Sequence, residues 1–427
     1  MTTEVAIINR SAVALAADSA VTVSSISGKK VYNTANKLFS LSRRHPVGVM
    51  IYGNASLNQI PWETLIKVYR KTSQTKSFNN LQDCATDFID FFGSIEHLFS
   101  KTDEVSAVVA ISLSAFFDIK QAYEEDIRKK TEISSKITKT EKKSIFKDRV
   151  EKSLGEWEAK KDAGSLKGVS AKAIESKHKN NFEIAINHVF EGIPLTQKLN
   201  KQLVKIGCLS IIKDSFSSSY SGIVIAGFGK DELTPDLASY KIDAMYEGSL
   251  KFARDDDKSY TTKPSPAIIS FAQDDIISTF INGIDPLAES VFKAILEDSL
   301  ETYFNLIIKS SQASGISISI DDLKRQYEQH KKFLMDSYAS KTDAFKKDYY
   351  RDPLDQVIGI LPKEELAEMA ESLVSLTALK RRVSMQIESV GGPIDVALIS
   401  KGDGFIWIKR KHYFESDLNP DFFVNRK

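Results

Sequence analysis

The stretch TTEVAIINRSAVALAADSAVT, residues 2–22, contains two segments of strand length that are separated by a short polar link. Residues 4–8 and 12–17 are apolar at most positions, and Asn9, Arg10 and Ser11 lie between them, which predicts a hairpin. The segments GKKVYNTANKLFSLS (28–42) and VGVMIYG (47–53) continue the pattern with turn-type residues between them. The first fifty residues therefore predict a β-sheet.

Strand and helix patterns then alternate along the rest of the chain. Helical periodicity follows the first strands, strand signals return near residue 221, and the chain ends in two strands joined by a KGDG turn. Two strand blocks separated by paired helices favour two stacked sheets with a helical layer on each outer face. The expected helices are 62–71, 80–99, 283–309 and 361–382, and the expected later strands are 221–229, 236–253, 266–273, 393–400 and 404–411.

Two of these helices have particular features. The helix over 283–309 places Val291, Ile295 and Phe304 on one apolar face. The helix over 361–382 has acidic residues in its first turn and basic residues in its last, which complements the helix dipole.

Two polar segments, 118–205 and 312–355, are expected to be helical insertions in a single domain that spans 1–427, because no repeat or low-complexity linker divides the chain. Residues 118–181 contain 17 Lys and Arg against 12 Asp and Glu. Such a segment is either a solvated helical insertion or a docking surface for an acidic partner or substrate.

Composition limits the classes of function. The 427-residue chain has a net charge of +1, which predicts neither a nucleic-acid nor a membrane partner. Its two cysteines, Cys84 and Cys208, form no disulfide framework or CxxC motif, so we expect a cytoplasmic protein. The longest apolar run, 105–117, is shorter than the roughly 20 residues of a membrane-spanning helix, so we expect a buried element there. The first twenty residues lack the pattern of a signal peptide.

Thr2 becomes a candidate nucleophile if Met1 is removed. A threonine hydroxyl needs a base, and its own free α-amino group can serve, because the pKa of that amine is about 8 whereas that of a lysine is about 10.4. The six histidines are scattered and form no catalytic or metal-binding pattern, so we expect no metal and no cofactor.

Such a site needs three further groups, and the sequence offers a candidate for each. A cation near the amine lowers its pKa, and Lys37 in NTANKLFSLS is placed for this. A carboxylate must pair with that cation, and Asp18 ends the second strand. A backbone N–H must face the developing oxyanion, and Gly53 stands where a strand turns toward a helix.

These motifs resemble the amino terminus of mature proteasome β-subunits and of the related bacterial ring peptidase, which are threonine-type N-terminal nucleophile (Ntn) hydrolases. The matching residues are the TTEV start, the segment from Val13 to Thr22, Lys37-Leu38-Phe39 and Gly53-Asn54-Ala55. Segments 221–249 and 389–405 resemble the central and last hairpins of the family more loosely. The two polar helical regions have no counterpart in a standard subunit.

The resemblance implies a role for each matched residue. Thr2 would be nucleophile and base, Asp18 and Lys37 its charge pair, and Gly53 an oxyanion donor. The residues implied to contact substrate are Thr22, Val21, Ala35 and Ile51, and those implied to support the nucleophile are Glu388 and Ser389.

The resemblance also implies the fold and the partners: an α+β, four-layer α/β/β/α sandwich of two antiparallel sheets with large helical insertions. We expect a threonine peptidase acting on polypeptides, assembled into a homo-oligomeric ring or a related closed assembly, with an ATPase unfoldase as partner if folded proteins are substrates. Two alternatives stay open: a non-catalytic scaffold subunit, and a small-molecule amidohydrolase of the same mechanism.

Overall fold

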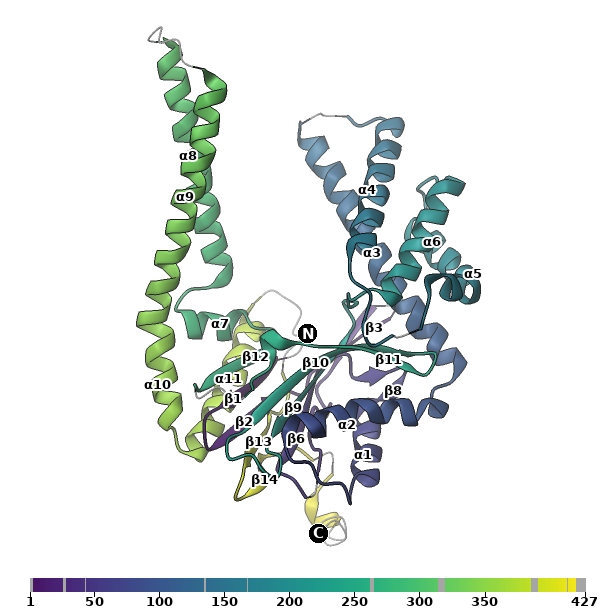
Figure 1. Ribbon diagram of the computed structural model, residues 1–427, viewed down its shortest axis with the longest axis vertical. Helices are drawn as coiled ribbons and strands as arrows, with labels where there is room; N and C mark the ends of the chain where they lie inside the picture. The colour runs from purple at the N-terminus through teal and green to yellow at the C-terminus, as the bar shows by residue number, and fades with distance from the viewer. Residues whose placement is uncertain are drawn as a thin grey trace.

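The computed structural model describes residues 3–25, 28–42, 44–133, 136–166, 168–261, 265–313, 319–384, 391–412 and 414–419 (Figure 1). Over these residues the protein is a mixed α/β protein with two antiparallel five-stranded sheets and many helices.

The first sheet contains the predicted N-terminal hairpin. The strands β1 (Thr3–Ile8) and β2 (Ala12–Ala17) pair antiparallel, which confirms that hairpin. On its far side β2 pairs with β13 (Asp395–Ser400), which in turn pairs with β14 (Gly404–Lys409), so the predicted C-terminal strands join the N-terminal ones. The edge strand β12 (Ala267–Ala272) pairs with β1.

The second sheet is built from the middle of the chain. Its strand order is β11–β10–β9–β6–β5, and all neighbours are antiparallel. The strands are β5 (Leu38–Ser40), β6 (Val47–Gly53), β9 (Ser221–Gly227), β10 (Asp236–Tyr246) and β11 (Ser249–Arg254). Two small ribbons are formed by β3 (Val21–Ser25) with β4 (Gly28–Tyr32) and by β7 (Ser56–Leu57) with β8 (Ile60–Pro61).

The central strands are buried on both faces, which explains their nearly continuous apolar sequences. Ala6 of β1 lies in a hydrophobic cluster that also contains Met50 and Val224 of the second sheet, so the two sheets share a core. Val5 of β1 points to the other face, where a separate cluster contains Leu366.

Helices cover the opposite faces of the sheets. Leu366 belongs to α11 (Lys363–Val383), which has the predicted acidic first turn and basic last turn. The helices α1 (Trp62–Thr72) and α2 (Leu81–Ser94) form a third cluster with β6, β9 and β10. The sequence predicted all three helices, α1 and α2 from their periodicity and α11 from Pro362 at its start and the charges in its first and last turns.

Two helical regions extend beyond the sheets on the same side of the molecule (Figure 1). Their bounds differ from the predicted 118–205 and 312–355, because polar composition marks the exposed part of a helix and not its ends. The first region comprises α3 (Lys101–Ile133), α4 (Lys139–Ala159), α5 (Ala171–Val189) and α6 (Gln197–Ile212). The second comprises α7 (Asp275–Asn282), α8 (Pro286–Ala313), α9 (Ile320–Lys346) and α10 (Asp352–Ile360). Short 3-10 helices span Glu96–Leu98, Asp256–Lys258 and Ser416–Leu418, and a π-helical turn spans Lys347–Arg351.

The apolar run 105–117 lies inside α3. Val108 and Phe116 belong to a cluster with α4, α5 and α6, whereas Phe117 is 49% exposed, so the run is buried only in part. By length and composition alone, α3 is the one helix among the described residues that could cross a membrane, and 33% of its most apolar window is buried.

Candidate functional site

The structure brings two predicted residues together at the end of the N-terminal hairpin. The Nζ atom of Lys37 lies 2.5 Å from Oδ1 of Asp18. The side chains are 3% and 0% exposed, so this ion pair is desolvated. Lys37 stands immediately before β5 of the second sheet, whereas Asp18 follows β2 of the first, so the pair connects the two sheets.

Asp18 also accepts hydrogen bonds from three backbone N–H groups. Its Oδ1 accepts from Thr3 at 3.1 Å, and its Oδ2 accepts from Ala20 at 3.2 Å and Gly391 at 2.9 Å. With the Lys37 ammonium, four donors surround one carboxylate. The Asp18 carboxylate is therefore held in a fixed position next to the first residue of β1.

A second carboxylate, Glu4, contacts the same lysine. Its Oε1 lies 3.1 Å from Nζ of Lys37, and its side chain is 0% exposed. The sequence reasoning did not assign this residue. The available signal was its position: Glu4 is two residues before Ala6 on a strand, so it points between the sheets, where a charge requires a partner.

The loop before β13 completes the surroundings of Asp18. The N–H of Ser19 donates to the carbonyl of Gly391 at 3.1 Å, and its hydroxyl donates to the carbonyl of Pro393. Gly392 has a φ of +76°, and a Cβ there would lie 2.8 Å from the carbonyl oxygen of Asn33. The glycine pair thus permits a close approach of backbone that a side chain would prevent.

Several predicted site residues lie wholly or partly outside the described structure. Thr2, Glu388 and Ser389 are outside the described residues, so their roles stay predictions. The backbone of Thr22 pairs with Val31 in the β3–β4 ribbon, but its side chain is outside the described part. Val21 begins the same ribbon and is partly exposed.

Gly53 and Ile51 lie on β6, next to the strand that follows Lys37. The N–H of Ile51 donates to the carbonyl of Lys37 at 2.9 Å. Its side chain is 3% exposed and packs in the cluster formed with α1 and α2. Gly53 is exposed, has a φ of +73°, and approaches Tyr220 so closely that a Cβ would lie 2.5 Å from the Tyr220 carbonyl oxygen. Their substrate-binding and oxyanion roles stay predictions.

The Gly53 turn is held by a serine-rich loop between α6 and β9. The carbonyl of Tyr220 accepts from the N–H of Asn54 at 3.1 Å. The hydroxyl of Ser221 donates to the carbonyl of Asn54 at 2.9 Å and accepts from Nε1 of Trp62 at 2.8 Å. The geometry of this turn therefore depends on a loop more than 160 residues away in sequence.

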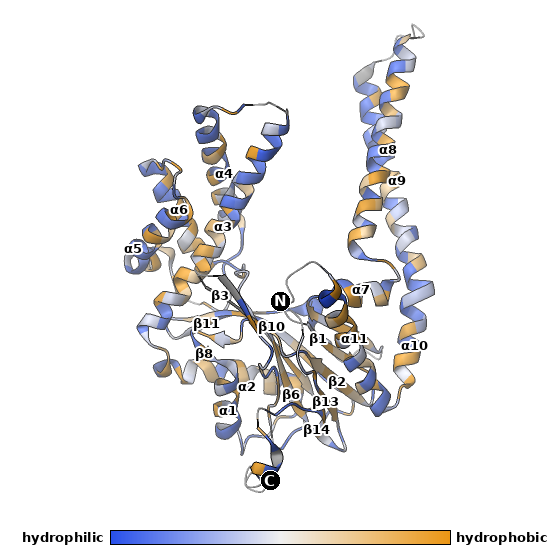
Figure 2. Ribbon diagram, turned by 180° about the vertical axis from the view of Figure 1, so that it is seen from behind, coloured by the Kyte–Doolittle hydropathy of each residue, from blue (hydrophilic) through white to orange (hydrophobic). Residues whose placement is uncertain are grey.

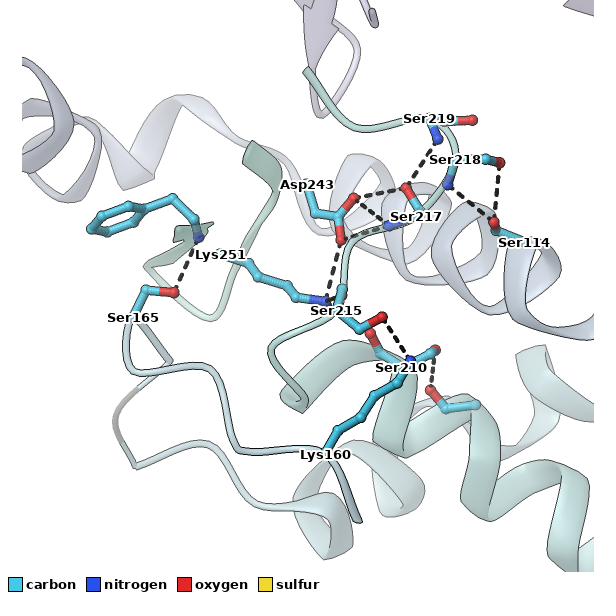
Figure 3. A network of polar contacts seen from close by, with 12 residues as sticks. Ser114, Lys160, Ser165, Ser210, Ser215, Ser217, Ser218, Ser219, Asp243 and Lys251 are labelled. Carbon is cyan, nitrogen blue, oxygen red and sulfur yellow. Dashed lines mark hydrogen bonds and ion pairs between the residues drawn. The ribbon is translucent and has the colours of Figure 1, made fainter. Parts of the chain in front are cut away.

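A second buried lysine anchors that loop (Figure 3). Lys251 lies 3.2 Å from Asp243, and both side chains are 1% exposed. Its ammonium also donates to the carbonyls of Ser210 and Ser215, at 2.8 and 2.7 Å, while Asp243 accepts from the hydroxyl of Ser217 at 2.7 Å. Burial lowers the pKa of Lys251. Because its donors are all engaged, we interpret Lys251 as structural and not as a catalytic base.

In the described part of the chain, no group of three or more His, Cys, Asp or Glu side chains is placed to hold a metal ion.

The features that define the candidate site are thus Asp18, Lys37 and Glu4 at the start of β1, with the Gly53 turn on the adjacent sheet. Comparison with models of known protein families gives no match to this chain, and a search of curated proteins gives no significant match either.

Proposed function

We propose that this protein is a threonine-dependent Ntn amide hydrolase and acts as a peptidase. The observation that carries the proposal is the buried Lys37–Asp18 pair, whose carboxylate also binds the peptide N–H of Thr3. Thr2 is covalently joined to Thr3, and consecutive Cα atoms are about 3.8 Å apart. Thr2, which carries the hydroxyl that the reaction requires, therefore directly precedes the residue that is hydrogen-bonded to the Lys37–Asp18 pair.

The arrangement favours Thr2 over Thr3 as nucleophile. Thr3 is fully buried, and β1 pairs with β12 and β2 on both sides. Its nitrogen is a peptide nitrogen that already donates to Asp18, so it cannot act as a base. Thr2 can supply both a hydroxyl and an amine once the peptide bond before it has been cleaved.

The fold supports the same proposal. Two sheets share one core, α11 packs on the outer face of the first, and α1 and α2 pack on the outer face of the second. We propose that these elements form the four-layer α/β/β/α sandwich of Ntn hydrolases, and that the two helical regions are insertions in a single domain.

The proposed reaction is acyl transfer through an ester. The Thr2 hydroxyl oxygen attacks the substrate carbonyl carbon while its proton passes to the Thr2 amine. When the C–N bond breaks, that proton leaves with the amine product and the acyl group stays on Thr2. Water then attacks the ester, with the amine again accepting a proton, and releases the acid and free Thr2. Neither step requires a cofactor.

Electrostatics gives the other residues their proposed roles. The Lys37 ammonium favours the neutral amine at Thr2, because a nearby cation opposes a second positive charge. Asp18 and Glu4 hold that ammonium in the buried site. The Gly53 turn would stabilise the oxyanion with a backbone N–H. The proposed substrate is a polypeptide, and an ATPase unfoldase would be required for folded ones.

The test compares two preparations that differ by one residue. A cleavable leader would leave either Thr2 or Ala-Thr2 as the amino terminus, with the product checked by intact mass. We expect cleavage of a fluorogenic peptide library only when Thr2 is first. Thr2→Ala with the same processing should lower kcat/KM by at least about 10³-fold, whereas Thr2→Ser should retain measurable activity.

The outcomes distinguish the alternatives. Activity that survives Thr2→Ala unchanged would refute the mechanism. If processed protein cleaves only a panel of small acyl amides, it is an amidohydrolase of the same mechanism. If it cleaves neither panel and an electrophilic β-lactone adds no mass at Thr2, the scaffold reading replaces the enzyme.

A further inference from the structure

The helices α8 and α9 form an arm that extends away from the sheets (Figures 1 and 2). They pack antiparallel: Lys346 near the end of α9 pairs with Glu289 near the start of α8. Farther out, the rings of Phe304 and Tyr327 stack with centroids 4.1 Å apart. The arm therefore has a base at Glu289 and Lys346 and a tip where the two helices are connected.

The helix α8 has the apolar composition of an enclosed helix, but its side chains are open to solvent. A helix that is apolar around its whole circumference is normally enclosed by protein or lipid. Apolar residues occur on every side of α8, yet none of its 28 residues is buried. The apolar face expected from the sequence is present, but it is open to solvent: Val291 is 46% and Ile295 56% exposed.

Seven exposed residues of α8 lie in a continuous stripe along one side of the helix. Intervals of three or four residues place them on one side of a helix. The stripe consists of Val291, Phe292, Ile295, Ser299, Tyr303, Leu306 and Ser310. On α9, Phe333 and Leu334 are also exposed, at 71% and 46%. Near the tip, a groove of about 290 Å³ between the helices is lined by Tyr303, Ile307 and Leu334 among others.

The area of this surface suits a stable protein interface. The exposed fractions of Phe292, Tyr303 and Phe333 are 53%, 65% and 71%. At about 200 Å² per aromatic side chain, these three alone expose roughly 400 Å². The aliphatic residues of the stripe add to this, toward the ~800 Å² that each partner buries in a standard interface.

We propose that this arm binds the same arm of a second copy of the chain, so that two α-helical hairpins form a four-helix bundle. In this arrangement each apolar stripe covers the other, which removes the conflict between composition and exposure.

The distribution of charge along the arm favours a second copy of the chain as the partner and an antiparallel orientation of the two arms. Residues 289–301 of α8, toward the base, contain four acidic side chains and one basic one. Over both helices, the half toward the base (286–301 and 333–346) has a net charge of −3, and the half toward the tip (302–313 and 319–332, with Asp321 and Asp322 included) has a net charge of +2. If two arms pack antiparallel, the acidic base of each faces the basic tip of the other, twice by symmetry. A parallel pair would bring like charges together.

The antiparallel arrangement also places the symmetry axis. A helix of 28 residues is about 42 Å long, and Ser299 lies at its middle. Ser299 of one copy would therefore face Ser299 of the other, whereas Ser310, near the tip, would face the base of the partner arm. This inference is independent of the chemistry proposed for Thr2, because it concerns only α8 and α9.

Self-association is measured by light scattering on the full-length protein after size-exclusion chromatography. We expect a mass of at least twice the 47.7 kDa of one chain, falling in the double variant Ile295→Glu/Leu306→Glu. The dimer Kd of this variant should rise on the order of 100-fold. The matched control is Ile184→Glu, since Ile184 is 68% exposed on α5, and it should leave the mass unchanged. Circular dichroism checks that every variant is folded.

Cross-linking tests the geometry separately. Both native cysteines are buried, and burial raises the pKa of Cys84 and Cys208 to about 12, so background oxidation should be low. Under mild oxidation, Ser299→Cys should form a disulfide-linked dimer. Ser310→Cys should stay monomeric on a denaturing gel.

Three results would overturn the proposal. One is a wild-type protein that stays monomeric at roughly 50 µM, well above the Kd of a stable dimer. Another is an assembly whose mass the stripe variant does not change. The third is efficient self-linking of Ser310→Cys without Ser299→Cys, which would indicate a parallel pair. A monomer that binds phosphatidylglycerol vesicles through the stripe would replace the second copy by a membrane.

Discussion

Lys37 Nζ lies 2.5 Å from Asp18 Oδ1 in a site that excludes water almost completely. The pair Lys67–Glu63 on α1 has the same separation of 2.5 Å, but its side chains are 44% and 36% exposed. The two ion pairs thus have the same N–O distance and differ in their exposure to solvent. Lys67–Glu63 can therefore serve as an exposed control for the buried Lys37–Asp18 pair.

Removing the buried cation should destabilise the protein strongly. In Lys37→Met, the carboxylates of Asp18 and Glu4 stay buried without their ammonium, which should lower the free energy of unfolding by about 3–5 kcal/mol. Lys67→Met removes a solvated pair and should cost at most about 0.5 kcal/mol. Urea denaturation of both variants measures the difference. Equal effects would mean that the buried pair carries no special role in stability.

Neutralising Glu4 should move the pH dependence of hydrolysis. The rate requires the neutral Thr2 amine, so kcat/KM should rise with pH through the pKa of that amine. Glu4→Gln removes a negative charge near the amine and lowers this pKa, so the acidic limb should shift to lower pH. Glu63→Gln, outside the site, should leave the limb in place. A limb that moves to higher pH in Glu4→Gln would contradict the proposed charge balance.

Gly53→Ala should disturb both stability and catalysis. The φ of +73° is unfavourable for alanine, and the new Cβ would lie 2.5 Å from a carbonyl oxygen, so we expect a loss of at least about 1–2 kcal/mol and lower kcat. Gly155 in α4 has no atom within 4 Å of an added Cβ, so Gly155→Ala should stabilise the helix by about 0.5–1 kcal/mol. Thermal unfolding and peptide hydrolysis measure both changes. Unchanged stability in Gly53→Ala would show that the turn relaxes freely.

His178 should make the first helical region sensitive to acid. Burial lowers the pKa of His178 below 6.5, opposed by the nearby carboxylates of Glu104 and Glu247 and reinforced by Lys177. The unfolded chain therefore binds a proton more readily, and stability falls as the pH drops below about 6.5. Above that pH, His178 is neutral in both the folded and the unfolded chain, so it does not make the free energy of unfolding depend on pH.

The measurement compares urea midpoints at pH 7.5 and pH 5.5. Between pH 7.5 and pH 5.5 the free energy of unfolding should fall more in the wild type than in His178→Gln. The two proteins share all other titratable groups, so the difference reports on His178. The ring also packs near Tyr246, so the absolute stability of the variant can differ, but only the difference between the two pH values tests the prediction. An equal loss in both proteins would rule out the effect.

Local patterns predicted much of the fold. The hairpin of β1 and β2, the helices α1, α2 and α11 and the closing strands β13 and β14 follow from periodicity and turn residues, because these signals act within a few residues. The ends of the helical regions were missed, since polar composition changes along a helix without ending it. That α8 leaves its apolar face exposed was also missed, because a sequence pattern gives a face but not what covers it.

For the candidate site, the amino-acid sequence already shows which chemical groups are available: a threonine behind Met1, a strand-end aspartate, a lysine and a turn glycine. The contacts of Lys37 with Asp18 and Glu4, and the hydrogen bond from Gly391, 373 residues away, to Asp18, become visible only in the folded chain. Such contacts depend on how two sheets stack. Burial then strengthens these contacts, because the lysine and the two carboxylates interact more strongly in the low-dielectric interior than they would in water.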